Sequence, residues 1–354
     1  MILDSLQLDD FRCFPRIEFH PGPGLNLLSA SNASGKSTLL EAIGVLLRLS
    51  SPRASKLNET IRRGSNGFSL QGRIEDRQLA CHLSRETGRR LILDNTLQAN
   101  AQEYLSLGLV AFFSSEDIEL VRGTSSKRRR FLDFLGSQAD VGYLKNLRNY
   151  ERALRARNFL LKEGPRRERE LAAYDGPFLS AGSYLRRVRG LLCAELSPLV
   201  ARHVRAISPR GETTTLGYQQ SGEDELSLAL TASAEKERRL RQTVVGPHRD
   251  DLALEFDDAA AGPFASEGQQ RTLALALRLA QAELIRQRRG TPPIYLLDDV
   301  FGELDTVRRQ RLLQALPDDA QRILTTTSWQ WLEEAGQAIH WTIEDGRLAE
   351  LKQP

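Results

Sequence analysis

Apolar residues recur at every second position within residues 1–30 and again from Phe68 to Leu93. This period is typical of strands with one buried face. A Pro-Gly-Pro-Gly turn at 21–24 divides the first region, and polar turns divide the second. The pattern predicts strands within residues 1–30 and an antiparallel meander over 68–93. The apolar run Tyr104–Phe113 is about half the length of a membrane span, so it predicts a buried strand.

The spacing changes to three or four residues near Thr124 and remains helical to about Ile207. No heptad pattern is sustained, which predicts a compact helical insertion and not a long coiled coil. A strand over 213–218 and a helix over 223–241 follow, and strands then alternate with helices. We therefore expect an α/β fold with an antiparallel β subdomain and an inserted helical domain. The expected divisions are 1–123, 124–240 and 241–354.

Composition narrows the class of protein only slightly. The formal net charge is +3, with 49 basic and 46 acidic residues, which permits a polyanionic partner without requiring one. Arginine dominates the basic residues, so arginine runs are weak indicators of nucleic-acid binding. The three cysteines have no metal-ligand spacing, and the N-terminus has no signal-peptide pattern. These features favour a protein of the reducing cytoplasm with no membrane partner.

A phosphate-binding loop is predicted where the apolar segment 25–29 leads into Gly-Lys-Ser-Thr and then into a helix. Backbone N–H groups of such a loop surround a polyphosphate, Lys36 adds charge, and Ser37 would hold Mg²⁺. The first glycine of the usual pattern is replaced by Ala30, which would cost about 1–2 kcal/mol if this position needs a positive φ. The alternative is a small-residue turn with an exposed lysine. The predicted phosphate-binding residues are Ala30, Ser31, Asn32, Ala33, Ser34, Gly35, Lys36, Ser37 and Thr38.

A second motif is the apolar segment 294–297 followed by Asp298 and Asp299. Parallel strands of α/β folds present ligand-binding groups at their carboxyl ends. We expect Asp298 to position Mg²⁺ and Asp299 to polarise the attacking water, with Lys36 as the third catalytic residue.

The helix predicted after Ser266 opens with Ser-Glu-Gly-Gln, which has two interpretations. Ser266 and Gln269 fit a capping box. Ser266, Gly268 and Gln269 also fit an ABC-type signature, in which a helix N-terminus faces a γ-phosphate. The two are compatible, and the position between the two phosphate motifs favours the signature. Glu-Leu-Asp at 303–305 and the segment 323–329 match a D-loop and a sensor strand, in which Thr326 and Thr327 stand in place of the usual switch histidine.

Four segments together resemble the RecF family, bacterial recombination and gap-repair ATPases with an ABC/SMC-type head. They are residues 10–14, 112–133, 245–251 and 297–305, and they extend over the chain in the family's order. Ser115 and Ser125 replace two prolines of the family pattern. With Ala30, these replacements indicate a divergent member.

The resemblance implies Mg-ATP as ligand, an ATP-dependent homodimer and weak, DNA-stimulated hydrolysis. Lys36, Ser37 and Asp298 of one subunit would meet Ser266 and Gly268 of the other, and Arg12 would join the nucleotide-binding residues. Gapped DNA or a junction of single and double strands is the implied substrate. RecR and RecO are the implied protein partners, and the cytoplasm is the implied location.

Several alternatives remain open from the sequence. The chain could be a degenerate RecF-like scaffold that binds nucleotide without turnover, or an ABC-type subunit of another system such as a transporter. The basic run 127–130 could be a solvated helix face or a contact with DNA phosphates. His248, after Gly-Pro, is expected to be a turn residue with satisfied hydrogen bonds and no chemistry.

Overall fold

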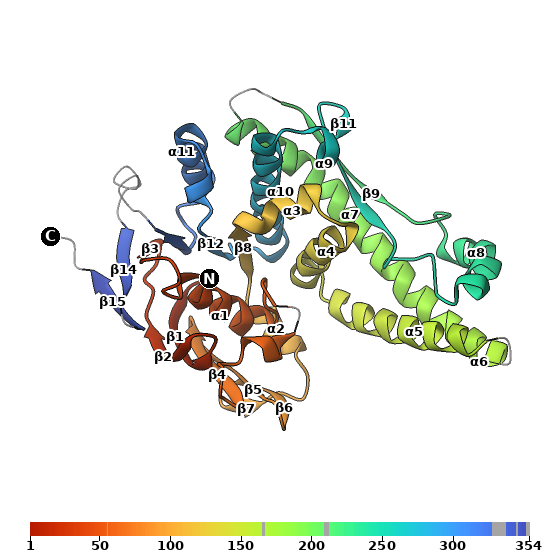
Figure 1. Ribbon diagram of the computed structural model, residues 1–354, viewed down its shortest axis with the longest axis horizontal. Coiled ribbons are helices and arrows are strands. Elements are labelled where there is room, and N and C mark those ends of the chain that lie inside the picture. Colours follow the sequence, from red (N-terminus) through yellow and green to blue (C-terminus); the bar gives the residue numbers. More distant parts are fainter. Residues whose placement is uncertain (55, 165–166, 209–211, 328–337, 345, 352–354) are drawn as a thin grey trace. The chain divides into compact units, whose positions relative to one another are not determined.

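The computed structural model describes residues 1–54, 56–164, 167–208, 212–327, 338–344 and 346–351. The chain forms two compact units, which Figure 1 shows with their elements labelled. One unit comprises residues 1–117 and 278–354, and the other comprises residues 118–277. In the described part of the chain, no helix has both the length and the apolar character needed to cross a bilayer.

The first unit contains a six-stranded sheet in the order β15-β14-β3-β13-β12-β8. All its pairs are parallel except β14–β15. Three of its inner strands, β3, β12 and β13, are buried along nearly their whole length, as expected for parallel strands covered on both faces. The strands are β3 (Leu25–Ser29), β8 (Val110–Ser114), β12 (Ile294–Asp298), β13 (Arg322–Thr326), β14 (Ala338–Glu344) and β15 (Arg347–Leu351).

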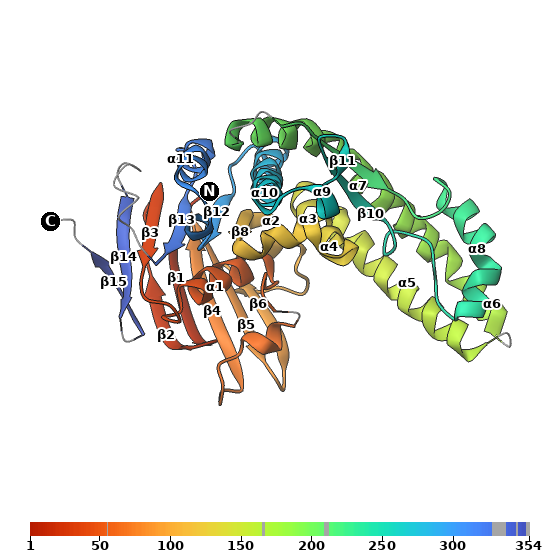
Figure 2. The same cartoon turned by 45° about the horizontal axis from the view of Figure 1, so that its top comes forward.

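A second sheet of this unit is antiparallel, in the order β2-β1-β4-β5-β6-β7. It confirms both the early strands and the meander predicted from the period of two. Its strands are β1 (Leu3–Phe11), β2 (Phe14–Phe19), β4 (Gly67–Ile74), β5 (Arg77–Ser84), β6 (Gly88–Leu93) and β7 (Thr96–Leu97). Helix α1 (Lys36–Arg48) contacts strands of both sheets and is buried almost all round, which explains why its residues 39–47 are apolar except for Glu41. Figure 2 shows α1 against β1 and β4.

The prediction of one buried strand over Tyr104–Phe113 is wrong in its first half. Helix α2 (Gln102–Leu107) precedes β8 there. The phenol of Tyr104 donates to the carbonyl oxygen of Leu46 at 2.9 Å, and Arg48 donates to the carbonyl oxygens of Leu105 and Gly108. These bonds fasten the segment to the end of α1, so the apolar side chains are buried in a helical turn.

The second unit is mainly helical. Helices α5 and α7 pack together, as Figures 1 and 2 show. A three-stranded antiparallel sheet in the order β11-β10-β9 packs against α7 and α4. The elements are α3 (Glu119–Arg122), α4 (Ser125–Ala139), α5 (Tyr143–Glu163), α6 (Glu168–Ala173), α7 (Asp175–Ile207), β9 (Thr214–Gln219), α8 (Leu226–Leu240), β10 (Asp251–Phe256), β11 (Ala259–Ala260), α9 (Ala261–Phe264) and the start of α10 (Glu267–Arg289). Helix α11 (Thr306–Ala315) belongs to the first unit.

The compact units do not follow the expected boundaries. The first falls at 117/118, near the expected 123/124, but the second falls at 277/278 and not at 240/241. Residues 251–256 pair as β10 with β9, and α9 packs against α3, so this segment completes the helical unit. The second boundary differs from the expected one because segments apart in the sequence pair as strands. The period of apolar residues does not reveal such pairing.

Candidate nucleotide-binding site

The predicted loop lies between β3 and α1, as the motif requires. Gly35 caps α1 with φ 104°, and its carbonyl oxygen accepts the first helical hydrogen bond from Leu39. A Cβ atom at position 35 would lie 2.2 Å from Cζ of Phe14 and 3.1 Å from Sγ of Cys13. Glycine is therefore required here both by backbone conformation and by close packing.

The strain expected at Ala30 occurs instead at Ala33. Ala33 has φ 64°, whereas Ala30 is not among the residues with positive φ. The N–H of Ser34 donates to the carbonyl oxygen of Ser31 at 3.4 Å, so Ala33 is the third residue of a tight turn. That position of a type II turn favours glycine or asparagine. The expectation assigned the backbone strain of a missing glycine to Ala30, three residues before the position that has the positive φ.

Lys36 points back over the loop. Its ammonium donates to the carbonyl oxygens of Ala30 at 2.5 Å and Ser31 at 2.9 Å. Burial lowers the pKa of Lys36, while the carboxylates of Asp299 and Asp298 act in the opposite direction. The structure thus brings the lysine and both carboxylates of the second motif within electrostatic range of one another. The alternative of an exposed lysine is wrong, because the residue is buried.

Ser37 and Asp298 are in direct contact. The hydroxyl of Ser37 donates to Oδ1 of Asp298 at 2.7 Å, and Thr325 of β13 donates to the same oxygen at 2.9 Å. A hydroxyl and a buried carboxylate are the hard oxygen ligands that Mg²⁺ prefers. No group of three or more His, Cys, Asp or Glu side chains that could hold a metal ion occurs among the described residues. The pair therefore fits an ion that takes its other ligands from phosphate and water.

Asp299 lies directly beyond the end of β12 with φ 50°. Its backbone N–H donates to Oγ1 of Thr325 at 2.9 Å, which fixes the turn. Burial raises the pKa of Asp299; Lys36 lowers it, and Asp298 raises it further. A carboxylate with a raised pKa is suited to accept a proton from water. Thr325 is hydrogen-bonded to both aspartates. It was not identified from the sequence pattern, which indicated Thr326 and Thr327 instead.

Arg12 lies beside α1. Its guanidinium binds both carboxylate oxygens of Glu41, at 2.7 and 3.0 Å, and donates to the carbonyl oxygen of Glu59. Glu41 is fully buried and also accepts from Ser51. In this structure Arg12 holds α1 to the segment 57–60, and its role toward a nucleotide stays a prediction.

The signature residues open α10 in the helical unit. The N–H of Ser266 donates to Oε1 of Gln269 at 2.8 Å, and the N–H of Gln269 is 3.4 Å from Oγ of Ser266. This reciprocal pair confirms the capping box. Ser266 is exposed, and the carbonyl oxygen of Gly268 accepts from Thr272 one turn later. An exposed, capped helix N-terminus leaves N–H groups free for an anion, so the signature interpretation remains compatible.

The two remaining head motifs are only partly described. Asp305 of the expected D-loop caps α11 by accepting from the N–H of Arg308 at 2.9 Å. The expected sensor strand is confirmed as β13 up to Thr326. Its last two residues, 328 and 329, lie outside the described part of the chain.

Comparison with known proteins agrees with this arrangement. The profile of the RecF/RecN/SMC N terminal domain matches residues 2–349. The chain is 36% identical over 347 residues to the DNA replication and repair protein RecF of Synechococcus sp. (strain JA-3-3Ab), covering 92% of this chain and 91% of the relative. It is 37% identical over 374 residues to that of Anaeromyxobacter sp. (strain Fw109-5), covering 99% and 100%. The chain belongs to the RecF family.

Solved structures place the fold in the same family. The recombination mediator protein RecF-ATP of the RecFOR pathway has a TM-score of 0.90 at 27% identity, covering 99% of this chain and 97% of that one. A Smc head domain from Pyrococcus furiosus has a TM-score of 0.57 at 17% identity, which supports the fold alone. The fold is that of an ABC/SMC-type ATPase head, as predicted.

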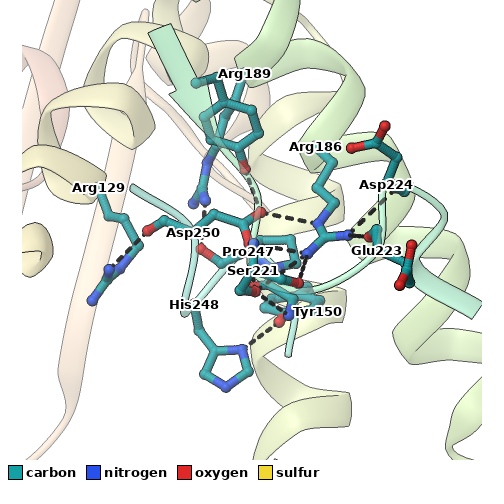
Figure 3. Close-up of polar contacts among 12 residues, drawn as sticks. Arg129, Tyr150, Arg186, Arg189, Ser221, Glu223, Asp224, Pro247, His248 and Asp250 are labelled. Carbon is teal, nitrogen blue, oxygen red and sulfur yellow. Dashed lines mark hydrogen bonds and ion pairs between the residues drawn. The ribbon is translucent and has the colours of Figure 1, made fainter. Parts of the chain in front are cut away.

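The family's Gly-Pro-His-Arg-Asp-Asp block contains a buried carboxylate, that of Asp250 (Figure 3). Arg186 of α7 donates to both its oxygens at 3.0 Å, and Tyr218 and Ser221 donate at 2.6 and 2.7 Å. Arg189, one turn along α7, donates to the carbonyl oxygen of Pro247 at 2.7 Å. This network holds the block to α7. Arg186 and Arg189 do not stand out in the sequence, because arginines are common throughout the chain.

His248 of this RecF-family block has satisfied hydrogen bonds, as expected. Its Nδ1 lies 2.6 Å from the phenol oxygen of Tyr150, and its Nε2 lies 3.1 Å from the carbonyl oxygen of Thr243. Burial lowers the pKa of His248 to about 4, so the ring is neutral near pH 7. A neutral ring that donates to Thr243 through Nε2 can accept from Tyr150 through Nδ1, which accounts for both contacts.

The basic run 127–130 is mostly engaged within the protein. Arg128 binds both oxygens of Asp251 at 2.7 and 2.8 Å, and Arg129 donates to the backbone of Asp250. Lys127 pairs with Glu119 at 3.4 Å on the surface. Two of the four cations therefore fasten α4 to the start of β10, and the run as a whole is not a free phosphate-binding face.

Proposed function

We propose that this RecF-family chain binds Mg-ATP and that ATP closes a homodimer on DNA, with slow hydrolysis that reopens it. The contact between Ser37 and Asp298 carries the nucleotide part of the proposal, because it brings the two expected Mg²⁺ ligands together. When bound, Mg²⁺ would neutralise phosphate charge. Lys36 would turn from the loop carbonyls to the phosphates, and Asp299 would accept the proton of the attacking water.

The proposed composite site also needs Ser266 and Gly268 of the partner subunit at the γ-phosphate. The exposure and capping of the α10 N-terminus support this proposal. The proposed substrate is gapped DNA or a junction of single and double strands. The names of the relatives support DNA replication and repair as the setting. RecR and RecO as partners, and a cytoplasmic location, are proposed from family resemblance.

A second candidate is a RecF-like scaffold that holds nucleotide without turnover. The left-handed conformation of Ala33 favours the scaffold. A residue other than glycine in this conformation carries about 1–2 kcal/mol of strain, which destabilises the phosphate-binding conformation of the loop. The arrangement of Lys36, Asp298 and Asp299 favours the ATPase. Measured turnover separates the two candidates.

Light scattering with and without ATP tests the dimer. The wild type is expected to dimerise with ATP. Ser266→Arg should remain monomeric while still binding nucleotide, because the larger side chain blocks closure. Asp299→Asn should persist as an ATP-bound dimer, because the water loses its polarising carboxylate but the phosphate contacts remain. If both variants dimerise like the wild type and Asp299→Asn hydrolyses ATP normally, the composite site is wrong.

A further inference from the structure

Helix α5 carries a line of cations on its solvent face. These residues recur at helical spacing and fall within roughly 100° of the circumference at 3.6 residues per turn. They are Lys145, Arg148, Arg152, Arg155 and Lys162, all exposed, and are called the α5 stripe below. The buried residues Tyr150, Ala153 and Leu160 lie on the opposite face. The stripe therefore points away from the core of the helical unit, along the edge where Figures 1 and 2 show α5.

Most cations of the α5 stripe make no ion pair with another described residue. Arg155 lies 3.8 Å from Glu151, one turn earlier, in an exposed pair. The other four make no ion pair in the described part of the chain. This distinguishes the α5 stripe from the run 127–130, whose Arg128 is held by Asp251.

Unpaired like charges in a row repel one another, so a line of this kind disfavours the bare helix and favours an anionic partner. From Lys145 to Lys162 the helix rises about 25 Å. Duplex DNA presents one charge for every 1.7 Å of axis, or roughly fifteen over that length. The side chains are long and mobile, which suits contact with phosphates that need no exact register.

We propose that the α5 stripe is a contact surface for the phosphate backbone of DNA. This inference rests on the DNA binding proposed above and assigns it to a helix that no sequence motif singled out. The binding is electrostatic and independent of base sequence, as expected for contacts with phosphates alone.

The test compares two triple variants that remove the same charge. Lys145→Gln/Arg148→Gln/Arg152→Gln removes three of the five cations of the α5 stripe. Arg205→Gln/Lys236→Gln/Arg239→Gln removes three exposed cations of α7 and α8. Binding of a labelled gapped duplex is measured over a salt series with ATP present. The first variant should bind roughly tenfold or more weakly at low salt, and its slope of log affinity against log salt should fall by about 0.9 for each lost contact.

The matched variant should bind within roughly twofold of the wild type and keep its salt slope. Both variants should have the ATP affinity and the unfolding temperature of the wild type, which would show that they fold. Equal losses in the two variants would mean diffuse attraction and would overturn the assignment, as would an unchanged first variant. Competition by polyglutamate as effective as by unlabelled DNA would also overturn it. If the wild type fails to bind DNA while binding ATP, the proposed function fails at its DNA part.

Discussion

The hydroxyl of Ser37 donates a hydrogen bond of 2.7 Å to Asp298, across 261 residues of sequence. Ser37 is the second residue of α1 and Asp298 is the last residue of β12, and β13 lies between β3 and β12 in the sheet. Because these strands are parallel, their carboxyl ends share an edge, where the loop, the carboxylates and Thr325 meet.

The Ser37–Asp298 pair predicts a Mg²⁺-dependent effect of Asp298→Asn. The substitution keeps the side-chain size but removes the charge that would hold the ion. We expect the increase in ATP affinity caused by Mg²⁺ to fall tenfold or more, or about 1.4 kcal/mol, with affinity in EDTA unchanged. Calorimetric titration in both conditions measures this. Asp319→Asn, at an exposed ion pair with Arg286, is the matched control. Equal Mg²⁺ dependence in both variants would contradict the assignment.

Glycine substitutions at Ala33 and Ala30 should act in opposite directions. Ala33→Gly relieves a positive φ and should raise the free energy of unfolding by up to about 1 kcal/mol, with equal or tighter ATP binding. Ala30→Gly relieves no backbone strain and should lower the free energy of unfolding by about 0.5–1 kcal/mol, because the unfolded chain gains conformational freedom. Urea unfolding of the two variants tests the pair. A stabilising Ala30→Gly would mean that the first loop position carries the strain.

Arg186→Leu should be strongly destabilising. It leaves the buried carboxylate of Asp250 without its main counter-charge, and removing one partner of a buried pair costs about 3–5 kcal/mol. Urea unfolding of the whole chain, followed by circular dichroism, measures the loss. Arg187→Leu is the control, since Arg187 is exposed and lies over the ring of Tyr184. A loss of unfolding free energy for Arg186→Leu as small as that for Arg187→Leu would show that the network around Asp250 contributes little.

His248 should make the fold sensitive to acid. Its pKa is about 4 in the fold, below the usual 6.5, so between these values the unfolded chain binds a proton that the folded chain does not. Stability is therefore complete above pH 6.5 and falls as pH drops toward 4, by up to about 3 kcal/mol. Protonation of Nδ1 would also break the bond from Tyr150. Asp250, Arg249 and Arg129 are the charged groups nearby.

The comparison of wild type with His248→Gln isolates this contribution. The difference in unfolding free energy between the two proteins should shrink as pH falls from 6.5 to 4, because only the wild type loses stability through this ring. A difference that stays constant over that range would show that the pKa of His248 in the fold equals its pKa in the unfolded chain.

Local chemistry determined much of this protein from the sequence alone. The period of two predicted the antiparallel sheet, and the loop motif placed Lys36 and Ser37 at the start of a helix. The Ser-x-x-Gln spacing predicted the cap of α10. Each of these depends on residues within a few positions of one another, where backbone geometry relates spacing directly to contact.

The tertiary structure decided what depends on distant partners. Tyr104 lies in a helix, where its phenol donates a hydrogen bond to the carbonyl oxygen of Leu46 in α1. Arg128 is held by Asp251, while Arg148 on α5 is exposed, although both occur in arginine-rich segments. Charge and hydropathy along a chain do not reveal which side chains meet across the fold, and that meeting separates a structural arginine from a free one.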